Sequence, residues 1–92
     1  MFFVVAYDIE DTKRRTKIHN TLKNYGTWIQ YSVFECHLTK IQYIQLREDL
    51  DDLIDESNDK IRFYFLCEKC QKKVDNIGDD TTAISENDAI II

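Results

Sequence analysis

The chain contains no proline and only two glycines, Gly26 and Gly78. Since these residues end or bend helices and strands, their scarcity predicts regular elements joined by short connections. Hydrophobic residues make up 43% of the 92 residues and aromatic residues 12%, which is typical of one folded domain. This composition disfavours a disordered chain, a collagen or a loop-rich disulfide scaffold. Two glycines are also too few for a phosphate-binding loop or a dinucleotide-binding fingerprint.

The N-terminal apolar run, Met1 to Tyr7, is not preceded by a basic segment or followed by a cleavage site of small residues. It also falls far short of the roughly 20 residues that a membrane-spanning helix needs. The chain has three cysteines, which cannot all pair with one another. We therefore expect a cytoplasmic protein with no membrane partner.

Charge is segregated along the sequence. The net charge of −5 combines +3 over residues 1–47, −7 over 48–59, +4 over 60–73 and −5 over the remainder. A phosphate backbone needs a local positive surface and does not require a positive total. The low isoelectric point of about 4.9 therefore weakens a nucleic-acid function without excluding it.

The first half of the chain predicts a strand and then a helix. Residues 1–8 are apolar at nearly every position, which is typical of a central strand covered on both faces. Asp11 or Thr12 is a suitable N-cap for a helix over Thr12 to Tyr25. Gly26 follows where a left-handed helix terminator is expected.

The second half predicts a hairpin, a helix and another strand. Residues 28–38 are strand-like, with a tight turn or a bulge at Gln30-Tyr31-Ser32 between two short strands. Thr39 and Gln42 form the pattern of a capping box for a helix that ends near Glu56. Residues 61–66 alternate as a strand does, and a short C-terminal strand is expected over Val74 to Gly78.

This β-α-β-β-α-β order predicts an α+β ferredoxin-like domain over residues 1–78, with an antiparallel sheet and two helices on one face. The other sheet face is left bare, with Phe34, Tyr64 or Leu66 on it depending on strand register. A second copy of the chain is the simplest cover, so we expect a homodimer. The tail, residues 79–92, ends in an apolar stretch that we expect to be exchanged with or packed on the partner protomer.

Asp8 is the first candidate site residue, because a carboxylate that ends an apolar strand suits a Mg²⁺ ion. The alternative is that Asp8 only caps the loop into the next helix. Lys13, Arg14, Arg15 and Lys17 begin that helix, where the helix dipole disfavours cations. Such a cluster fits phosphodiester binding, and the alternative is a solvated face neutralised by neighbouring acids.

Cys67-Glu68-Lys69-Cys70 has the C-x-x-C spacing of a zinc knuckle or a redox pair. A second such pair is missing, and Cys36 with His37 completes a zinc site only if strand pairing brings them alongside. A redox pair is expected after a strand and at the start of a long helix. We favour ordinary buried or half-buried thiols over both.

Several segments together resemble one known family: Val4-Val5-Ala6-Tyr7-Asp8-Ile9, Lys13-Arg14-Arg15, Tyr25-Gly26, Ile29-Gln30-Tyr31-Ser32-Val33-Phe34-Glu35-Cys36 and Ile61-Arg62-Phe63-Tyr64. Over about residues 1–78 the chain closely resembles the CRISPR-associated Cas2 family. The resemblance implies a ferredoxin-like homodimer in which Asp8 of each protomer approaches its mate and holds a divalent metal, Mg²⁺ or Mn²⁺.

The resemblance also implies site residues. Arg15 matches an arginine tied to phosphate binding or cleavage, and Arg14 and Lys17 are expected to bind nucleic acid with it. Tyr31, Ser32 and Phe34 belong to the family's core and dimer motif. Trp28 stands where a basic residue often occurs, so one expected phosphate contact is absent.

The function implied is CRISPR adaptation, or spacer acquisition, in antiviral defence. The expected activity is metal-dependent endonuclease cleavage of single-stranded RNA or double-stranded DNA, with Asp8 and Arg15 as catalytic residues. The expected partners are nucleic acid and the CRISPR integrase subunit. The alternatives are a non-catalytic subunit that bridges DNA in the integrase complex, and an unrelated RNA-binding or toxin-like ferredoxin fold.

Overall fold

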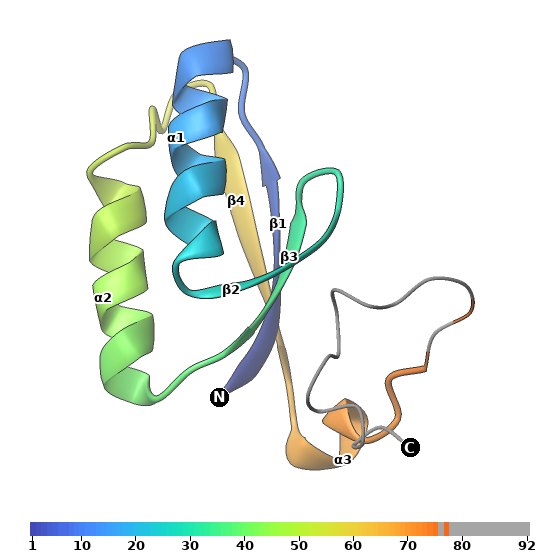
Figure 1. Ribbon diagram of the computed structural model, residues 1–92. Coiled ribbons are helices and arrows are strands. Elements are labelled where there is room, and N and C mark those ends of the chain that lie inside the picture. Colours follow the sequence, from blue (N-terminus) through green and yellow to red (C-terminus); the bar gives the residue numbers. More distant parts are fainter. Residues whose placement is uncertain (76, 78–92) are drawn as a thin grey trace.

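The computed structural model describes residues 1–75 and 77. The elements follow in the order β1 (Phe2–Asp8), α1 (Thr12–Lys23), β2 (Gly26–Gln30), β3 (Val33–His37), α2 (Lys40–Asp51), β4 (Lys60–Leu66) and α3 (Glu68–Gln71). The four strands form one sheet in the order β2-β3-β1-β4, and every neighbouring pair is antiparallel. Figure 1 shows α1 and α2 side by side on one face of this sheet. The predicted ferredoxin-like α+β fold is confirmed.

Both predicted helix starts are confirmed by their caps. The Asp11 carboxylate accepts the Arg14 backbone N–H at 2.8 Å. Thr39 and Gln42 form the full capping box, with a 3.2 Å bond from the Gln42 N–H to the Thr39 hydroxyl and a 2.9 Å bond from the Thr39 N–H to the Gln42 carbonyl oxygen. These bonds satisfy backbone donors that the first helical turn leaves unpaired.

The helices end earlier than the sequence suggests. α1 ends at Lys23, two residues before the predicted end, and α2 ends at Asp51 rather than near Glu56. Acidic residues crowd the end of α2, where the negative end of the helix dipole disfavours them. Residues after Asp51 continue as turns that lead to β4.

Gly26 is needed for a reason other than the predicted one. It is the first residue of β2, and α1 is already terminated by Asn24 in a right-handed helical conformation. A Cβ atom on Gly26 would lie 2.5 Å from the Cys36 sulfur and 2.5 Å from the Glu35 carbonyl oxygen. The glycine therefore allows β2 to approach β3 closely, and the predicted left-handed terminator was wrong.

Strand register decides which residues face the helices. Phe34 lies opposite Val5, and both are fully buried against the helices, so the expectation that Phe34 lies on the bare face was wrong. Tyr64, opposite Val4, lies on the other face and is 47% exposed. We call this other face the open face; its residues are Phe2, Val4, Ala6, Asp8, Val33, Glu35, His37, Lys60, Arg62, Tyr64 and Leu66.

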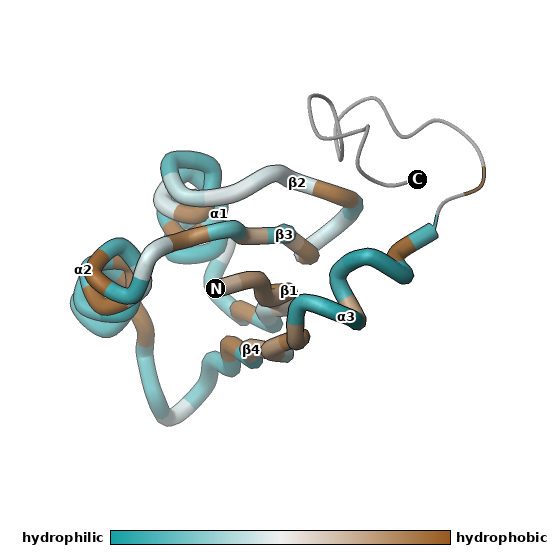
Figure 2. The backbone as a smooth tube through the Cα atoms, turned by 90° about the horizontal axis from the view of Figure 1, so that it is seen from below, coloured by the Kyte–Doolittle hydropathy of each residue, from teal (hydrophilic) through white to brown (hydrophobic). Residues whose placement is uncertain are grey.

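A third helix, α3, follows β4, where no helix is expected from the sequence. Figure 2 shows α3 on the opposite side of the sheet from α1 and α2. Val74, Asp75 and Ile77 belong to no strand, and the rest of the expected C-terminal strand and tail lies outside the described residues. Among residues 1–75 and 77, none of the helices has the length and apolarity of a membrane span.

Candidate metal and nucleic-acid site

Asp8 is the last residue of β1 and pairs with Lys60 of β4. Its side chain is exposed on the open face, because it alternates with buried Tyr7 along the strand. Asp11, not Asp8, caps α1. Within the described part of the chain the Asp8 carboxylate has no hydrogen-bond or ion-pair partner, so its oxygens are available to a ligand.

A single protomer supplies only part of a metal site. The described residues contain no group of three or more His, Cys, Asp or Glu side chains that could hold a metal ion. A carboxylate nevertheless has the oxygen donors that Mg²⁺ and Mn²⁺ prefer. An ion at Asp8 therefore needs further ligands from water or from a second chain.

Arg15 is tied to the connection between β1 and α1. Its guanidinium donates a 2.8 Å hydrogen bond to the Ile9 carbonyl oxygen and a 3.2 Å bond to the Thr12 hydroxyl. These bonds hold the arginine beside the residue that follows Asp8. The side chain stays exposed and keeps further N–H groups for a phosphate.

Arg14 has a different environment from Arg15. Its guanidinium donates to both carboxylate oxygens of Asp59, with distances of 2.5 Å from Nε and 3.1 Å from Nη2. Asp59 is buried, and it also accepts the backbone N–H groups of Glu10 and Asp55. The Arg14 hydrogen bond is the main reason why the pKa of Asp59 falls to about 2. Arg14 thus has a structural partner, and its role in nucleic-acid binding stays a prediction.

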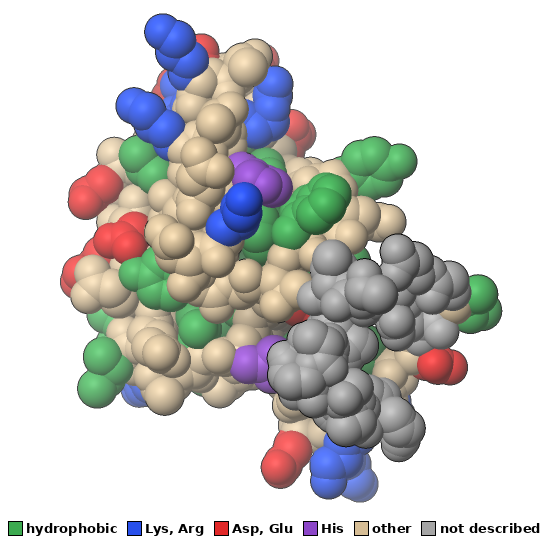
Figure 3. All heavy atoms as spheres, viewed as in Figure 1, with side chains coloured by type: hydrophobic (Ala, Val, Ile, Leu, Met, Phe, Trp, Pro, Cys, Tyr) green, Lys and Arg blue, Asp and Glu red, His purple; other side chains and the backbone are tan. Residues whose placement is uncertain are grey.

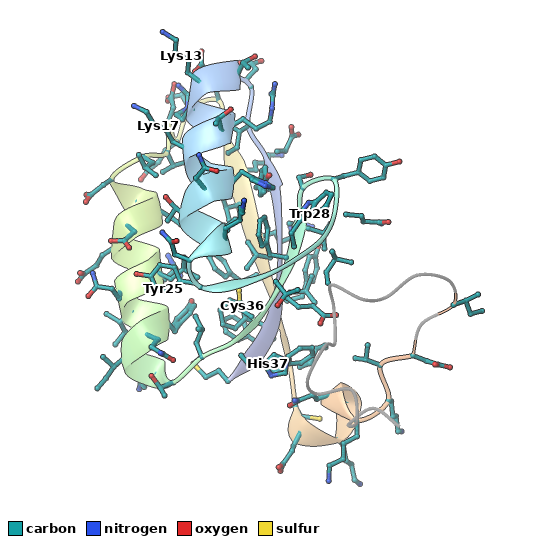
Figure 4. The ribbon with its side chains drawn as sticks, viewed as in Figure 1. Lys13, Lys17, Tyr25, Trp28, Cys36 and His37 are labelled. Atoms are coloured by element: carbon teal, nitrogen blue, oxygen red, sulfur yellow. The ribbon has the colours of Figure 1, made fainter. Side chains whose placement is uncertain are left out.

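Lys13 and Lys17 complete the basic end of α1. Both are exposed, and within the described residues neither ammonium group has an ion-pair partner. Figure 3 shows the lysine and arginine side chains gathered around the N-terminal half of this helix. Figure 4 shows Lys13 and Lys17 extending away from the sheet. This surface can contact a phosphate backbone without sequence preference.

The Gln-Tyr-Ser-Val-Phe segment shapes the β2–β3 hairpin. Tyr31 is at the turn with a φ angle of 41°, and the residue is 85% exposed. The Trp28 indole N–H donates to the Tyr31 carbonyl oxygen at 2.8 Å, and the Ser32 carbonyl accepts the Tyr7 N–H at 3.1 Å. Phe34 packs on the His19 ring of α1, with centroids 5.1 Å apart. The segment thus fixes the turn and joins β3 to the core.

The cysteines differ from the sequence expectation. Cys67 and Cys70 are exposed, not buried or half-buried, whereas Cys36 lies in the core. Cys36 and His37 are neighbours on β3 and point to opposite faces of the sheet: Cys36 is buried under the helices, whereas His37 lies beside Gln71 of α3 (Figure 4). Strand pairing therefore does not bring both Cys36 and His37 to Cys67 and Cys70.

Sequence reasoning missed Asp59 as a site-supporting residue. It lies 45 positions from Arg14, in a turn that resembles any other solvated acidic stretch. Only its position directly before the apolar-alternating strand could have suggested burial.

The sequence matches one protein family and named members of it. The family model described as CRISPR associated protein Cas2 matches residues 1–74. A protein of Chloroflexus aurantiacus named CRISPR-associated endoribonuclease Cas2 1 is 42% identical over 93 aligned residues, covering 100% of both chains.

Two solved structures resemble the fold. Streptococcus pyogenes Cas2, crystallised at pH 6.5, is 34% identical with a TM-score of 0.74, and the match covers 85% of this chain and 100% of that one. A chain of the partial Cas6-RT-Cas1–Cas2 complex is 30% identical with a TM-score of 0.69, and the match covers 83% of each chain.

Proposed function

Because the chain belongs to the CRISPR-associated Cas2 family, we propose that it acts in CRISPR adaptation as a metal-dependent endonuclease on RNA or double-stranded DNA. The observation that carries this proposal is the unpartnered Asp8 carboxylate, exposed at the end of β1 beside the basic end of α1. Relatives of similar sequence are named endoribonucleases, which supports phosphodiester cleavage as the reaction.

The active form is a homodimer. The open face exposes Tyr64 and leaves Val4, Ala6 and Val33 only half-buried, and α3 is the only described helix on that side. A second copy of the chain covers such a face with an identical surface. The two-fold axis then brings the Asp8 carboxylates of both protomers together, which supplies the second acidic ligand that one chain lacks.

In the proposed cleavage reaction the metal ion and the side chains of the protein have different roles. When bound, Mg²⁺ or Mn²⁺ supplies a water molecule of lowered pKa and a positive charge for the scissile phosphate. The two Asp8 carboxylates would hold the ion by charge and oxygen donation. Arg15 and Lys17 offset the negative charge that develops on the phosphate, and the bonds of Arg15 to Ile9 and Thr12 fix its position.

The test replaces Asp8 with asparagine, which keeps the size but removes the charge that a hard cation needs. Asp8→Asn should abolish Mg²⁺-dependent cleavage of RNA and of duplex DNA while leaving the melting temperature unchanged. Asp11→Asn is the matched control, because it removes the same charge three residues away and asparagine also caps a helix. Cleavage by Asp8→Asn at the parent rate would contradict the proposal.

A second candidate function is a non-catalytic subunit that bridges DNA within the CRISPR integrase complex. Two observations favour it: within the described residues Asp8 belongs to no group of three metal-ligating side chains, which makes a sparse catalytic site, and the Arg14 guanidinium is already bound by Asp59. A chain of similar fold occurs in the Cas6-RT-Cas1–Cas2 complex. If neither the parent nor Asp8→Asn cleaves, yet both hold duplex DNA in a salt-dependent way, this function replaces the first.

A further inference from the structure

Cys67 and Cys70 form a pair of neighbouring thiols on the open-face side of the sheet. Their sulfur atoms lie 3.4 Å apart, and both residues are exposed. Cys67 directly follows β4, and Cys70 lies within the four-residue helix α3. The sulfurs need only a small side-chain rotation to reach the separation of about 2.05 Å found in a disulfide.

The two thiols differ in their protonation. The Cys67 sulfur accepts the Cys70 backbone N–H at 3.4 Å, and this bond together with the Cys70 thiol lowers the pKa of Cys67. The same neighbour raises the pKa of Cys70. Since the thiolate is the nucleophile, Cys67 is the attacking residue of the pair and Cys70 the resolving one.

The third cysteine takes no part. Cys36 is fully buried, and burial raises its pKa to about 12. Such a thiol is inert to disulfide exchange in the folded protein. Cys67 and Cys70 are therefore the only reactive pair among the described residues.

We propose that Cys67 and Cys70 are a redox-active dithiol that forms a reversible intramolecular disulfide by exchange with a low-molecular-weight disulfide such as oxidised glutathione. The Cys67 thiolate attacks one glutathione sulfur and releases the first glutathione thiolate. Cys70 then attacks the Cys67 sulfur and releases the second. Two thiols and one glutathione disulfide thus become one protein disulfide and two molecules of reduced glutathione.

The disulfide affects the connection between the sheet and the residues after α3. It closes a ring of residues 67–70 at the end of β4. In the same helix the Gln71 side-chain amide lies 3.3 Å from the His37 ring of β3. Oxidation therefore stiffens the segment that joins β4 to the C-terminal part of the chain. The site is separate from Asp8 and does not rest on nuclease activity.

The test incubates the folded protein with glutathione at increasing ratios of oxidised to reduced form, blocks free thiols and digests with trypsin without reductant. Cleavage after Arg62, Lys69 and Lys72 gives peptides 63–69 and 70–72, each with one cysteine. In the oxidised protein these peptides should be joined, with a mass two hydrogens below their sum, and reduction should separate them. Cys36 should stay unmodified unless the protein is denatured.

Single variants distinguish the attacking cysteine, Cys67, from the resolving cysteine, Cys70. Cys70→Ser should accumulate a glutathione adduct on Cys67, whereas Cys67→Ser should gain an adduct on Cys70 several-fold more slowly. Free thiols at high oxidised glutathione, or a disulfide to Cys36 or between two chains, would overturn the proposal. One tightly bound zinc per chain that both variants lose would also overturn it, because the pair would then be a metal site.

Discussion

Arg14 and Asp59 join the start of α1 to the residue before β4 through two hydrogen bonds, of 2.5 and 3.1 Å, between the guanidinium and both carboxylate oxygens. The Asp59 side chain is fully buried in this pair, and two backbone N–H groups satisfy its remaining acceptor sites. The pair therefore fixes the loop between β1 and α1, on which Asp8 and Arg15 depend for their relative positions.

Replacing Asp59 with asparagine should lower the melting temperature by about 5 to 15 °C, because it leaves a guanidinium next to a group that no longer carries charge. The folded pKa of about 2 lies below the ordinary value of 3.8. The stabilisation is therefore present above about pH 4 and is lost as the pH falls toward 2. Thermal melts of the parent should show a larger acid loss of melting temperature than those of Asp59→Asn. Asp51→Asn, at an exposed residue, is the control. An equal fall in the melting temperature of that variant would contradict a special role for Asp59.

Gly26→Ala should destabilise the fold by about 1 to 3 kcal/mol, because the new methyl group meets the Cys36 sulfur and the Glu35 backbone. Urea unfolding measures the change. Thr27→Ala, at the next residue of the same strand, serves as the control and should cost less. A Gly26→Ala variant as stable as the parent would show that β2 and β3 approach less closely.

Tyr25 should titrate far above an ordinary tyrosine. Its hydroxyl donates a 2.6 Å hydrogen bond to Asp49 of α2, and this bond raises its pKa to about 12. The bond stabilises the protein below about pH 10, and this contribution is lost as the pH rises through 12. The difference in absorbance titration between the parent and Tyr25→Phe isolates this group from the other tyrosines. Tyr25→Phe should cost about 0.5 to 1 kcal/mol, since the bond is half exposed. Titration of Tyr25 near pH 10 would contradict its hydrogen bond to Asp49.

A charge on the open face should prevent dimer formation. Tyr64→Glu places a carboxylate where the second copy is expected, so light scattering should report a monomer at concentrations at which we expect the parent to be a dimer. Ile44→Glu is a matched control, because Ile44 is 48% exposed on α2 and Tyr64 is 47% exposed on β4. If Ile44→Glu is a monomer and Tyr64→Glu stays a dimer, the interface lies on the helices instead of on the open face.

Local patterns predicted most of the fold. The apolar run of β1, the cap at Asp11 and the capping box at Thr39 each depend on neighbours within four residues, so the sequence carries their signal directly. The side to which Phe34 points depends on which residue of β1 lies opposite it. That choice is made by pairing across the sheet and is not visible in a local pattern.

The candidate site also combines local features, which the sequence predicts, with long-range contacts, which it does not. Asp8 is recognisable in the sequence because a carboxylate ends an apolar strand. The sequence does not show that Arg14 and Arg15 have different partners, because Asp59 is 45 residues from Arg14 while the Ile9 carbonyl lies six residues from Arg15. The exposure of Cys67 and Cys70 follows from α3, which is too short to show helical periodicity.

The central claim is that Asp8 of two protomers holds one divalent metal ion. Titration of Mn²⁺ followed by electron paramagnetic resonance measures it most directly, because free and bound ions give different signals and the measurement does not depend on nuclease activity. We predict one saturable ion for every two chains in the parent protein and none in Asp8→Asn. One ion per chain, or binding that persists in Asp8→Asn, would contradict the shared site.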